Sequence, residues 1–226
     1  MSIAEKLQTV ADNQQRVYDA GQKSEYDAFW DAYQQNGKRT NYNNAFYGDG
    51  WNDTTFKPKY DIIPTDRNNG GMFSYSAITD IKGIIEKQGV KLDLSLCNSE
   101  TQFTWALNTR LPVMDYSAST GVSFYYSYKL KSIDKIILKQ DGSQAFNFAG
   151  AASLKDVIFE GVIGKNIDLK ECPLSKASIE SVFYALSSTT TGTTATFRQS
   201  AVNAAFTDDD WNAKVAGKSN WTITLA

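Results

Sequence analysis

Residues 124–133 (FYYSYKLKSI) and residues 148–157 (FAGAASLKDV) carry the same apolar pattern 24 positions apart. Each segment begins with a phenylalanine, and aliphatic residues follow six and nine positions later. The matched sets are Phe124/Leu130/Ile133 and Phe148/Leu154/Val157. A unit of roughly 20–29 residues is too small to bury its own apolar face, so such units stack and share one core. The pattern therefore predicts stacked units, each made of a short strand and a loop.

Further matches extend this pattern over the middle of the chain. Two more units fit the same spacing, at Met72/Ile78/Ile81 and at Trp105/Leu111/Met114. A second echo relates residues 89–97 (GVKLDLSLC) to residues 164–172 (GKNIDLKEC). We predict an α+β fold in which residues 72–172 form a stack of short strands, a solenoid of leucine-rich-repeat size. The side chains expected to point into its shared core are Ile78, Leu111, Leu130 and Leu154.

Both ends of such a stack need a cover, because an open end exposes core and unpaired backbone. Residues 38–71 are loop-like and rich in Asn, Asp and aromatic residues, which favours a cap or linker. A carbohydrate surface is the alternative, with candidate ligand-binding aromatics at Tyr42, Phe46, Tyr47 and Trp51. Residues 173–226 predict an atypical terminal unit and C-terminal cap. It contains a helix entered at Ser175, a strand at 195–197, a helix after Thr207 and a strand at 221–225.

Residues 1–37 predict an N-terminal helix that ends at Asn36-Gly37. The alternating four-three spacing of a coiled-coil seam relates Ile3, Leu7, Val10 and Val17, with Gln14 as a polar interruption. An aromatic stripe at residues 26–33 indicates that the end of the helix docks onto another surface. One helix packed on its own domain and a self-associating stalk are both compatible with this pattern.

The chain has no histidine among its 226 residues, which removes the commonest general base and the commonest neutral metal ligand. We expect no catalytic residue, no cofactor and no metal site. The net charge of −2 without any long basic run argues against nucleic acid and against a polybasic membrane surface. No apolar secretory leader and no membrane-spanning stretch is apparent, so we expect synthesis in the cytoplasm without a signal peptide.

The acidic run at Asp208, Asp209 and Asp210 follows Thr207 and favours helix capping over calcium binding, because its spacing differs from that of an EF-hand loop. Asp141-Gly142 and Asn69-Gly70-Gly71 are turn signals. The scattered carboxylates at Asp61, Asp66 and Asp115 show no catalytic pairing.

The two cysteines, Cys97 and Cys172, match in the second echo, so we expect them in one column of the core. Several strand steps between them imply a separation on the order of 15 Å. A disulfide requires Cα atoms within about 7 Å. We therefore predict two reduced, buried thiols that are not bonded to each other.

An aromatic residue followed by two spaced aliphatic residues resembles the BspA-like leucine-rich repeats. Residues 167–175 (IDLKECPLS), with the ending at residues 220–223 (NWTI), resemble the terminal repeat of that family. Residues 26–37 and 50–53 resemble the N-termini of such proteins in gut-dwelling Firmicutes and their prophages. The usual asparagine ladder is missing, and Lys135 stands where the next unit has Phe159. The resemblance implies binding, with no ligand transferred residue by residue.

Three functional hypotheses follow. The first is a non-enzymatic recognition or structural module of a prophage tail or baseplate, which would be part of a phage virion and would bind a protein or a cell-surface glycan. By analogy with tail proteins, it would be an oligomer, with a trimer favoured. The second is a cytoplasmic scaffold that binds another protein through the solenoid face. The third is a carboxylate-dependent carbohydrate-active enzyme, which would need two facing acids.

Overall fold

The computed structural model describes residues 3–65, 71–93 and 103–226, and the side chains of residues 3–7 and 24 lie outside this part. Its helices are α1 (Ile3–Tyr33), the 3-10 helix η1 (Gln35–Gly37), α2 (Ile81–Gln88), α3 (Lys176–Ala185), α4 (Gln199–Ala205) and α5 (Asp208–Ala216). Its strands are β1 (Arg110–Asp115), β2 (Gly121–Ser123), β3 (Ser132–Ile137), β4 (Ala145–Asn147), β5 (Asp156–Glu160), β6 (Ile167–Leu169), β7 (Thr193–Phe197) and β8 (Trp221–Leu225). The fold is α+β, as predicted.

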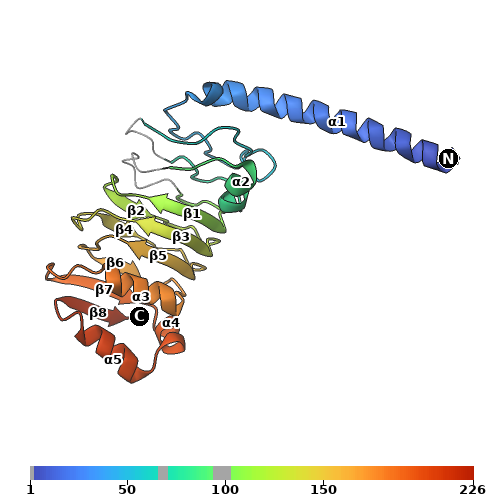
Figure 1. Ribbon diagram of the computed structural model, residues 1–226. Coiled ribbons are helices and arrows are strands. Elements are labelled where there is room, and N and C mark those ends of the chain that lie inside the picture. The colour runs from blue at the N-terminus through green and yellow to red at the C-terminus, as the bar shows by residue number, and fades with distance from the viewer. Residues whose placement is uncertain (1–2, 66–70, 94–102) are drawn as a thin grey trace.

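The strands form small parallel sheets. Their orders are β1-β3-β5, β2-β4 and β6-β7-β8. From β1 to β5 the chain alternates between the first two sheets, so each circuit adds one strand to each (Figure 1). Corresponding side chains of successive circuits therefore lie one above another, which is the physical origin of the repeated apolar pattern.

Backbone hydrogen bonds between circuits define which residues correspond. Lys155 N donates to Lys131 O (2.9 Å), Lys131 N donates to Thr109 O (2.9 Å), and Thr109 N donates to Thr79 O (2.5 Å). The residues just before these four therefore occupy equivalent places, and they are Ile78, Asn108, Leu130 and Leu154. The predicted alignment of the third and fourth units is confirmed at these positions.

The predicted alignment of the second unit is wrong by three residues. Leu111 pairs with Ile133 across β1 and β3, and Asn108 takes the place that the pattern assigned to Leu111. The cause is loop length. In the first two units, the core phenylalanine precedes the equivalent residue (Ile78 or Asn108) by five positions. In the next two units, the phenylalanine precedes Leu130 or Leu154 by six positions. A fixed six-residue spacing therefore selects Met72 and Trp105 where the structure has Phe73 and Phe103.

Phenylalanine rings form a column through the core. Centroids of neighbouring rings lie 5.2–5.7 Å apart, and all the rings are buried. The column consists of Phe46, Phe73, Phe103, Phe124 and Phe148. The four side chains predicted to share one core are buried in the same cluster, which confirms that prediction, and they are Ile78, Leu111, Leu130 and Leu154.

Strand β3 contains a bulge that explains the mismatch between Lys135 and Phe159. Ile133 pairs with Val157 and Ile136 pairs with Phe159, so a step of three residues on β3 faces a step of two on β5. The extra residue puts the apolar Ile136, rather than Lys135, opposite Phe159. Lys135 Nζ instead lies 2.5 Å from the Glu160 carboxylate.

The first unit differs from the prediction, because α2 lies where a strand was expected. The Asp80 side chain caps the helix by accepting a hydrogen bond from Gly83 N, and Gly89 ends it with φ +66°. Ile81 and Ile85, one turn apart, are both buried. Caps at both ends and an apolar residue every four positions favour a helix here.

At the other end of the first sheet, α3 covers the edge of β5. Ser178 Oγ accepts a hydrogen bond from Val157 N (2.9 Å), and Ser181 Oγ accepts one from Phe159 N (3.2 Å). These hydroxyls satisfy strand N–H groups that would otherwise lie at an open edge.

The predicted C-terminal elements are confirmed as α3, β7, α5 and β8, and α4 is an additional helix. Thr207 Oγ1 caps α5 by accepting a hydrogen bond from Asp210 N (3.2 Å), and the three aspartates lie in its first turn. The capping interpretation of that acidic run is confirmed. Gly142 has φ +65° in the turn before β4, as its sequence predicted, whereas Asn69 and Gly70 lie outside the described residues.

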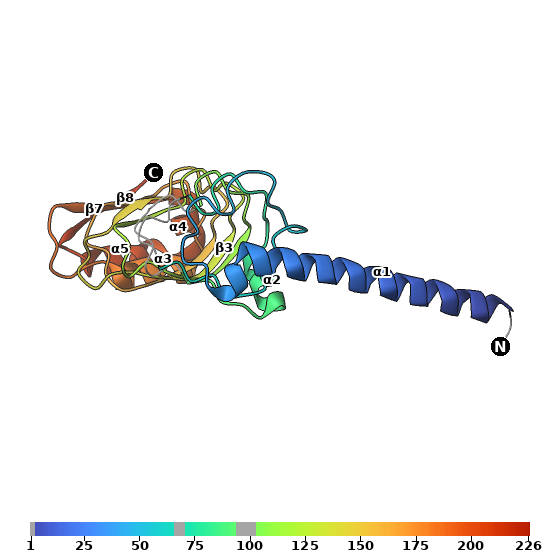
Figure 2. The same ribbon diagram turned by 90° about the horizontal axis from the view of Figure 1, so that it is seen from above.

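Helix α1 projects away from the remainder of the molecule in both views (Figures 1 and 2). Among its described side chains, the buried one is Trp30 near the C-terminal end, and Gln34, just after the helix, is buried as well. Gln34 Oε1 accepts hydrogen bonds from Lys59 N and Tyr60 N (both 2.9 Å), and Gln34 Nε2 donates to Tyr60 O (2.8 Å). The predicted docking of the helix end is confirmed. Residues 8–23 are exposed throughout.

Candidate binding surface

Successive turns of the chain share one left-handed backbone position. It is occupied by Gly48, Tyr75, Trp105, Tyr126 and Gly150, whose φ values are +88°, +59°, +58°, +54° and +78°. The N–H group of each of the first four donates to the carbonyl of the residue just before the next one. These bonds make the five positions structurally equivalent, although their spacing in the sequence varies.

The three aromatic side chains at this position contact one another outside the core. The ring centroids of Tyr75 and Trp105 lie 6.4 Å apart and those of Trp105 and Tyr126 lie 4.2 Å apart, with interplanar angles of 10° and 4°. Tyr47, just before Gly48, adds a ring 5.3 Å from Tyr75. We call these four side chains the aromatic ladder. They remain 39–52% exposed.

The backbone geometry disfavours aromatic residues at these positions. A side chain with a Cβ costs about 1–2 kcal/mol in the left-handed region, whereas glycine adopts it freely. Glycine occupies both outer turns, at Gly48 and Gly150, and Tyr, Trp and Tyr occupy the three turns between them. Ring stacking returns only about 0.5–1.5 kcal/mol per pair. Strained residues of this kind cluster at functional sites, which makes the ladder the leading candidate for a binding surface.

Stacking covers part of the ring surface of the ladder. Trp105 and Tyr126 stack almost in parallel with ring centroids 4.2 Å apart, so the ring planes that face each other are covered. Tyr125 meets Tyr126 edge-on at 4.5 Å. Burial, together with the neighbouring Tyr126, raises the pKa of Tyr125. Mutual contacts also hold the rings in place before any partner binds.

The structure places the four aromatics proposed from sequence in different environments. Tyr42 and Phe46 are buried, so the expectation that they form a ligand-binding surface is wrong: their rings fill the core. Tyr47 is exposed and belongs to the ladder. Trp51 is half-buried and lies apart from the ladder, against Phe29 of α1.

Sequence reasoning missed Tyr75 and Tyr126 and assigned Trp105 to the core. A usable signal was present, because each ladder residue of the middle turns follows a core phenylalanine by two positions. The three segments read FSY at residues 73–75, FTW at 103–105 and FYY at 124–126. The outer turns read FYG at residues 46–48 and FAG at 148–150.

A second apolar surface lies at the base of α1. A hollow of about 300 Å³ is lined by Tyr26, Phe29, Gly50, Trp51 and Thr55. Phe29 stacks on Tyr33 with ring centroids 5.6 Å apart, yet it remains exposed.

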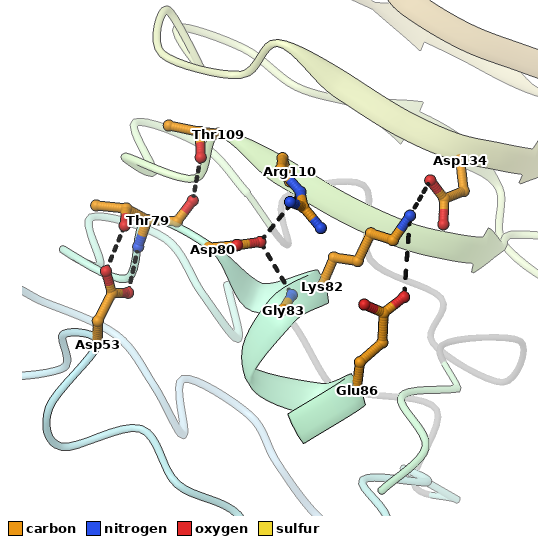
Figure 3. A network of polar contacts seen from close by, with 9 residues as sticks. All are labelled: Asp53, Thr79, Asp80, Lys82, Gly83, Glu86, Thr109, Arg110 and Asp134. Carbon is orange, nitrogen blue, oxygen red and sulfur yellow. Dashed lines mark hydrogen bonds and ion pairs between the residues drawn. The ribbon is translucent and has the colours of Figure 1, made fainter. Parts of the chain in front are cut away.

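Charged residues gather around the first turn of α2 (Figure 3). Arg110 Nε lies 3.4 Å from Asp80, and Lys82 Nζ lies 2.8 Å from Asp134. Asp53 accepts hydrogen bonds from the Thr79 hydroxyl and from Thr79 N, the latter at 2.7 Å. Each partner comes from a different circuit of the chain, so this network ties successive units together.

The carboxylates considered as possible catalytic acids have local partners. Asp61 accepts a hydrogen bond from Lys91 N (2.8 Å), and Asp115 accepts one from Ser117 N (2.9 Å). Asp66 lies outside the described residues.

Cys172 is a buried free thiol in the turn after β6. Its N–H donates to Leu169 O (3.0 Å), just as Ala151 N donates to Phe148 O (3.0 Å) in the preceding unit. Burial raises the pKa of this thiol to about 12, which makes it unreactive at neutral pH. The prediction of a buried, reduced thiol is confirmed for Cys172, and Cys97 lies outside the described residues.

Within residues 3–65, 71–93 and 103–226, no group of three or more Cys, Asp or Glu side chains is placed to hold a metal ion. No helix in the same part of the chain is long and apolar enough to cross a bilayer.

Comparison of this chain with protein-family models, with curated proteins and with solved structures finds no match.

Proposed function

We propose that this chain is a non-enzymatic binding module, and that the aromatic ladder is its recognition surface. The observation that carries the proposal is the placement of Tyr75, Trp105 and Tyr126 in left-handed turns where glycine would be more favourable. Their stacking and partial exposure support a role outside the core.

The scaffold in this proposal is a short leucine-rich-repeat solenoid of the BspA-like type. Three features support it: parallel pairing between successive circuits, a continuous phenylalanine column and helices that cover both ends of the first sheet. A solenoid presents equivalent turns at regular intervals along one side, which is where the ladder lies.

The partner that best fits the ladder is a protein surface. Sugar rings pack on exposed aromatic faces, and stacking has covered the facing planes of Trp105 and Tyr126. Protein-binding surfaces are enriched in Tyr and Trp on a rigid support, because these side chains supply contact area at a small cost in conformational entropy. A cell-surface glycan is the alternative partner, and the test below distinguishes the two.

The biological setting rests on the resemblance of the repeats and the N-terminal segment to those of prophage-encoded proteins. In that setting, the chain is made in the cytoplasm and serves in a phage tail or baseplate as a receptor-recognition component. A cytoplasmic scaffold would use the same surface for a different partner.

The test uses the full chain and a ladder variant, Tyr75→Gly/Trp105→Gly/Tyr126→Gly. Glycine suits the left-handed turns, so the variant should fold. Tyr184→Ala is the matched control, because it removes an exposed tyrosine from α3, outside the ladder. The probes are a displayed random-peptide library and a glycan array, and soluble glycans are assayed for released reducing ends.

We expect selected peptides to bind the full chain and the control equally, and to bind the ladder variant at least about 30-fold more weakly, as for a hot spot of 2 kcal/mol or more. Glycan binding that is lost in the ladder variant would show that the partner is a glycan and not a protein. Peptide binding that survives in the ladder variant would exclude the ladder as the recognition surface. Release of reducing ends would show an enzyme.

A further inference from the structure

The exposed part of α1, from Gln8 to Lys23, is unusual because no buried side chain anchors it. The helix has 31 residues, and every residue from Gln8 to Lys23 is exposed. Two apolar side chains on this part, Val10 and Val17, are 53% and 74% exposed. Most helices in proteins owe their stability to packing of an apolar face, and hydrogen bonds such as Gln8 to Asp12 add only about 0.2–0.5 kcal/mol each.

The side chains of this segment are sorted by face. In the register of the predicted seam, Val10, Gln14 and Val17 occupy the central a and d positions, and Ala11 and Tyr18 flank them. The charged side chains from residue 8 to residue 23 all fall on the opposite face, and they are Asp12, Arg16, Asp19 and Lys23. Between residues 8 and 23, the seam and its flanks therefore carry no charge that would repel an identical helix.

We propose that α1 is a self-association segment through which copies of this chain form a parallel, in-register coiled coil. The occupant of the exposed seam is thus α1 of a second copy.

Gln14 supports a copy of the same chain as the partner. A polar side chain in an apolar seam needs a polar partner in the same layer, and an amide both donates and accepts. A second amide at the matching position meets this need, and in-register pairing of identical helices provides one.

The distribution of apolar residues supports the parallel direction. By sequence, the large seam residues lie between residues 3 and 17, and the seam continues as Gly21 and Ser24. A parallel pair sets Val10 against Val10 and Val17 against Val17. An antiparallel pair centred on Gln14 sets the larger N-terminal residues against Gly21 and Ser24 and leaves their surface uncovered. The small residues near the base also let the two bodies approach.

Self-association would deepen the proposed function, and this consequence rests on the ladder being a recognition surface. A parallel coiled coil holds the bodies at one end, so several ladders can engage one target. Linked sites can strengthen overall binding by 10²–10⁴-fold without any new contact.

The first experiment measures the mass of the full chain by light scattering at micromolar concentrations. The seam variant is Val10→Asn/Val17→Asn. Its matched control is Thr9→Asn/Arg16→Asn, which introduces the same two asparagines one position earlier along the helix, outside the seam. We expect an oligomer for the full chain and the control and a monomer for the seam variant. A monomeric full chain, or equal behaviour of the two variants, would overturn the proposal.

The second experiment determines the direction of pairing. Val17→Cys should form a disulfide-linked dimer under mild oxidation, because residue 17 meets residue 17 only in the parallel arrangement. Arg16→Cys, on the outer face, should remain monomeric on a non-reducing gel, like the unmodified chain. Absence of the Val17→Cys dimer in an oligomeric protein would refute the parallel register. These readouts do not involve the ladder, so their failure is distinct from failure of the proposed function.

Discussion

Substitution of Gly150 by alanine tests whether the turns are packed as closely as the structure shows. Gly150 has φ +78°, and a Cβ added there would lie 2.9 Å from the Tyr126 Cα and 3.1 Å from its ring. Gly48 takes the equivalent position at the other end of the column with φ +88°, but a Cβ there would meet no atom within 4 Å. The two glycines therefore share backbone strain and differ in steric contact.

The expected costs differ accordingly. Gly48→Ala should lower the free energy of unfolding by about 1–2 kcal/mol, the cost of a Cβ in the left-handed region. Gly150→Ala should add the cost of displacing a neighbouring backbone, about 1–3 kcal/mol by comparison with overpacked cores. Its total is about 2–5 kcal/mol. For a chain of this size, each kcal/mol corresponds to roughly 2–4 °C in Tm.

The assay is urea unfolding followed by tryptophan fluorescence, with midpoint and slope fitted separately. Near-ultraviolet circular dichroism gives a second readout, because Gly150→Ala should displace Tyr126 and disturb its stack with Trp105, whereas Gly48→Ala should not. If both variants lose the same free energy, the turn at Gly150 does not pack against Tyr126 and the alignment of the turns is wrong. If neither loses any, the left-handed column itself is wrong.

The remaining predictions concern the core, the thiol, pH and metals. Leu154→Ala should cost about 2–5 kcal/mol through a core cavity, whereas Ile158→Ala, at an exposed position of β5, should cost less than about 1 kcal/mol; equal losses in urea unfolding would argue against the assigned register. Cys172 should react with a thiol reagent only after unfolding, since burial raises its pKa, and rapid labelling of the folded chain at this residue would contradict its placement. Hydrogen bonds from Lys59 and Tyr60 lower the pKa of Asp31, so its contribution to stability should be present above the unfolded pKa of about 3.9 and be lost as pH falls through the lower folded value. The stability difference between the wild-type chain and Asp31→Asn should therefore shrink on acidification, and a pH-independent difference would refute the assigned bonds. EDTA should leave the Tm unchanged, and a lower Tm would reveal a structural metal.

Several elements of this protein could be predicted from sequence because their signals are local. The apolar pattern from Phe124 to Val157 repeats with equal loops, so its alignment could be read directly. The N-terminal helix, its glycine-containing end and the capped helix after Thr207 depend on residues within a few positions of one another. Periodicity and capping act over that range.

Other features depended on contacts between residues 20 to 30 positions apart. Because the second unit has a spacing of five rather than six positions, a fixed six-residue pattern selected Leu111. Only the hydrogen bonds and pairing with the next unit show that Asn108 matches Leu130. In the first unit, α2 replaces a strand. Its caps were present in the sequence, but an apolar repeat shared with strands concealed them.

The sequence by itself determined that aromatic residues would be important near the start of the stack, but it could not separate the buried rings from the exposed ones. Tyr42 and Tyr47 are the same residue type in one loop, and tertiary packing buries the first and exposes the second. The ladder was likewise decided by tertiary structure. A positive φ at Tyr75 or Trp105 runs against local preference and is held by hydrogen bonds to the next turn. Local sequence determines which residues can form an element, whereas contacts between circuits decide the register in which they meet and therefore which side chains reach the surface.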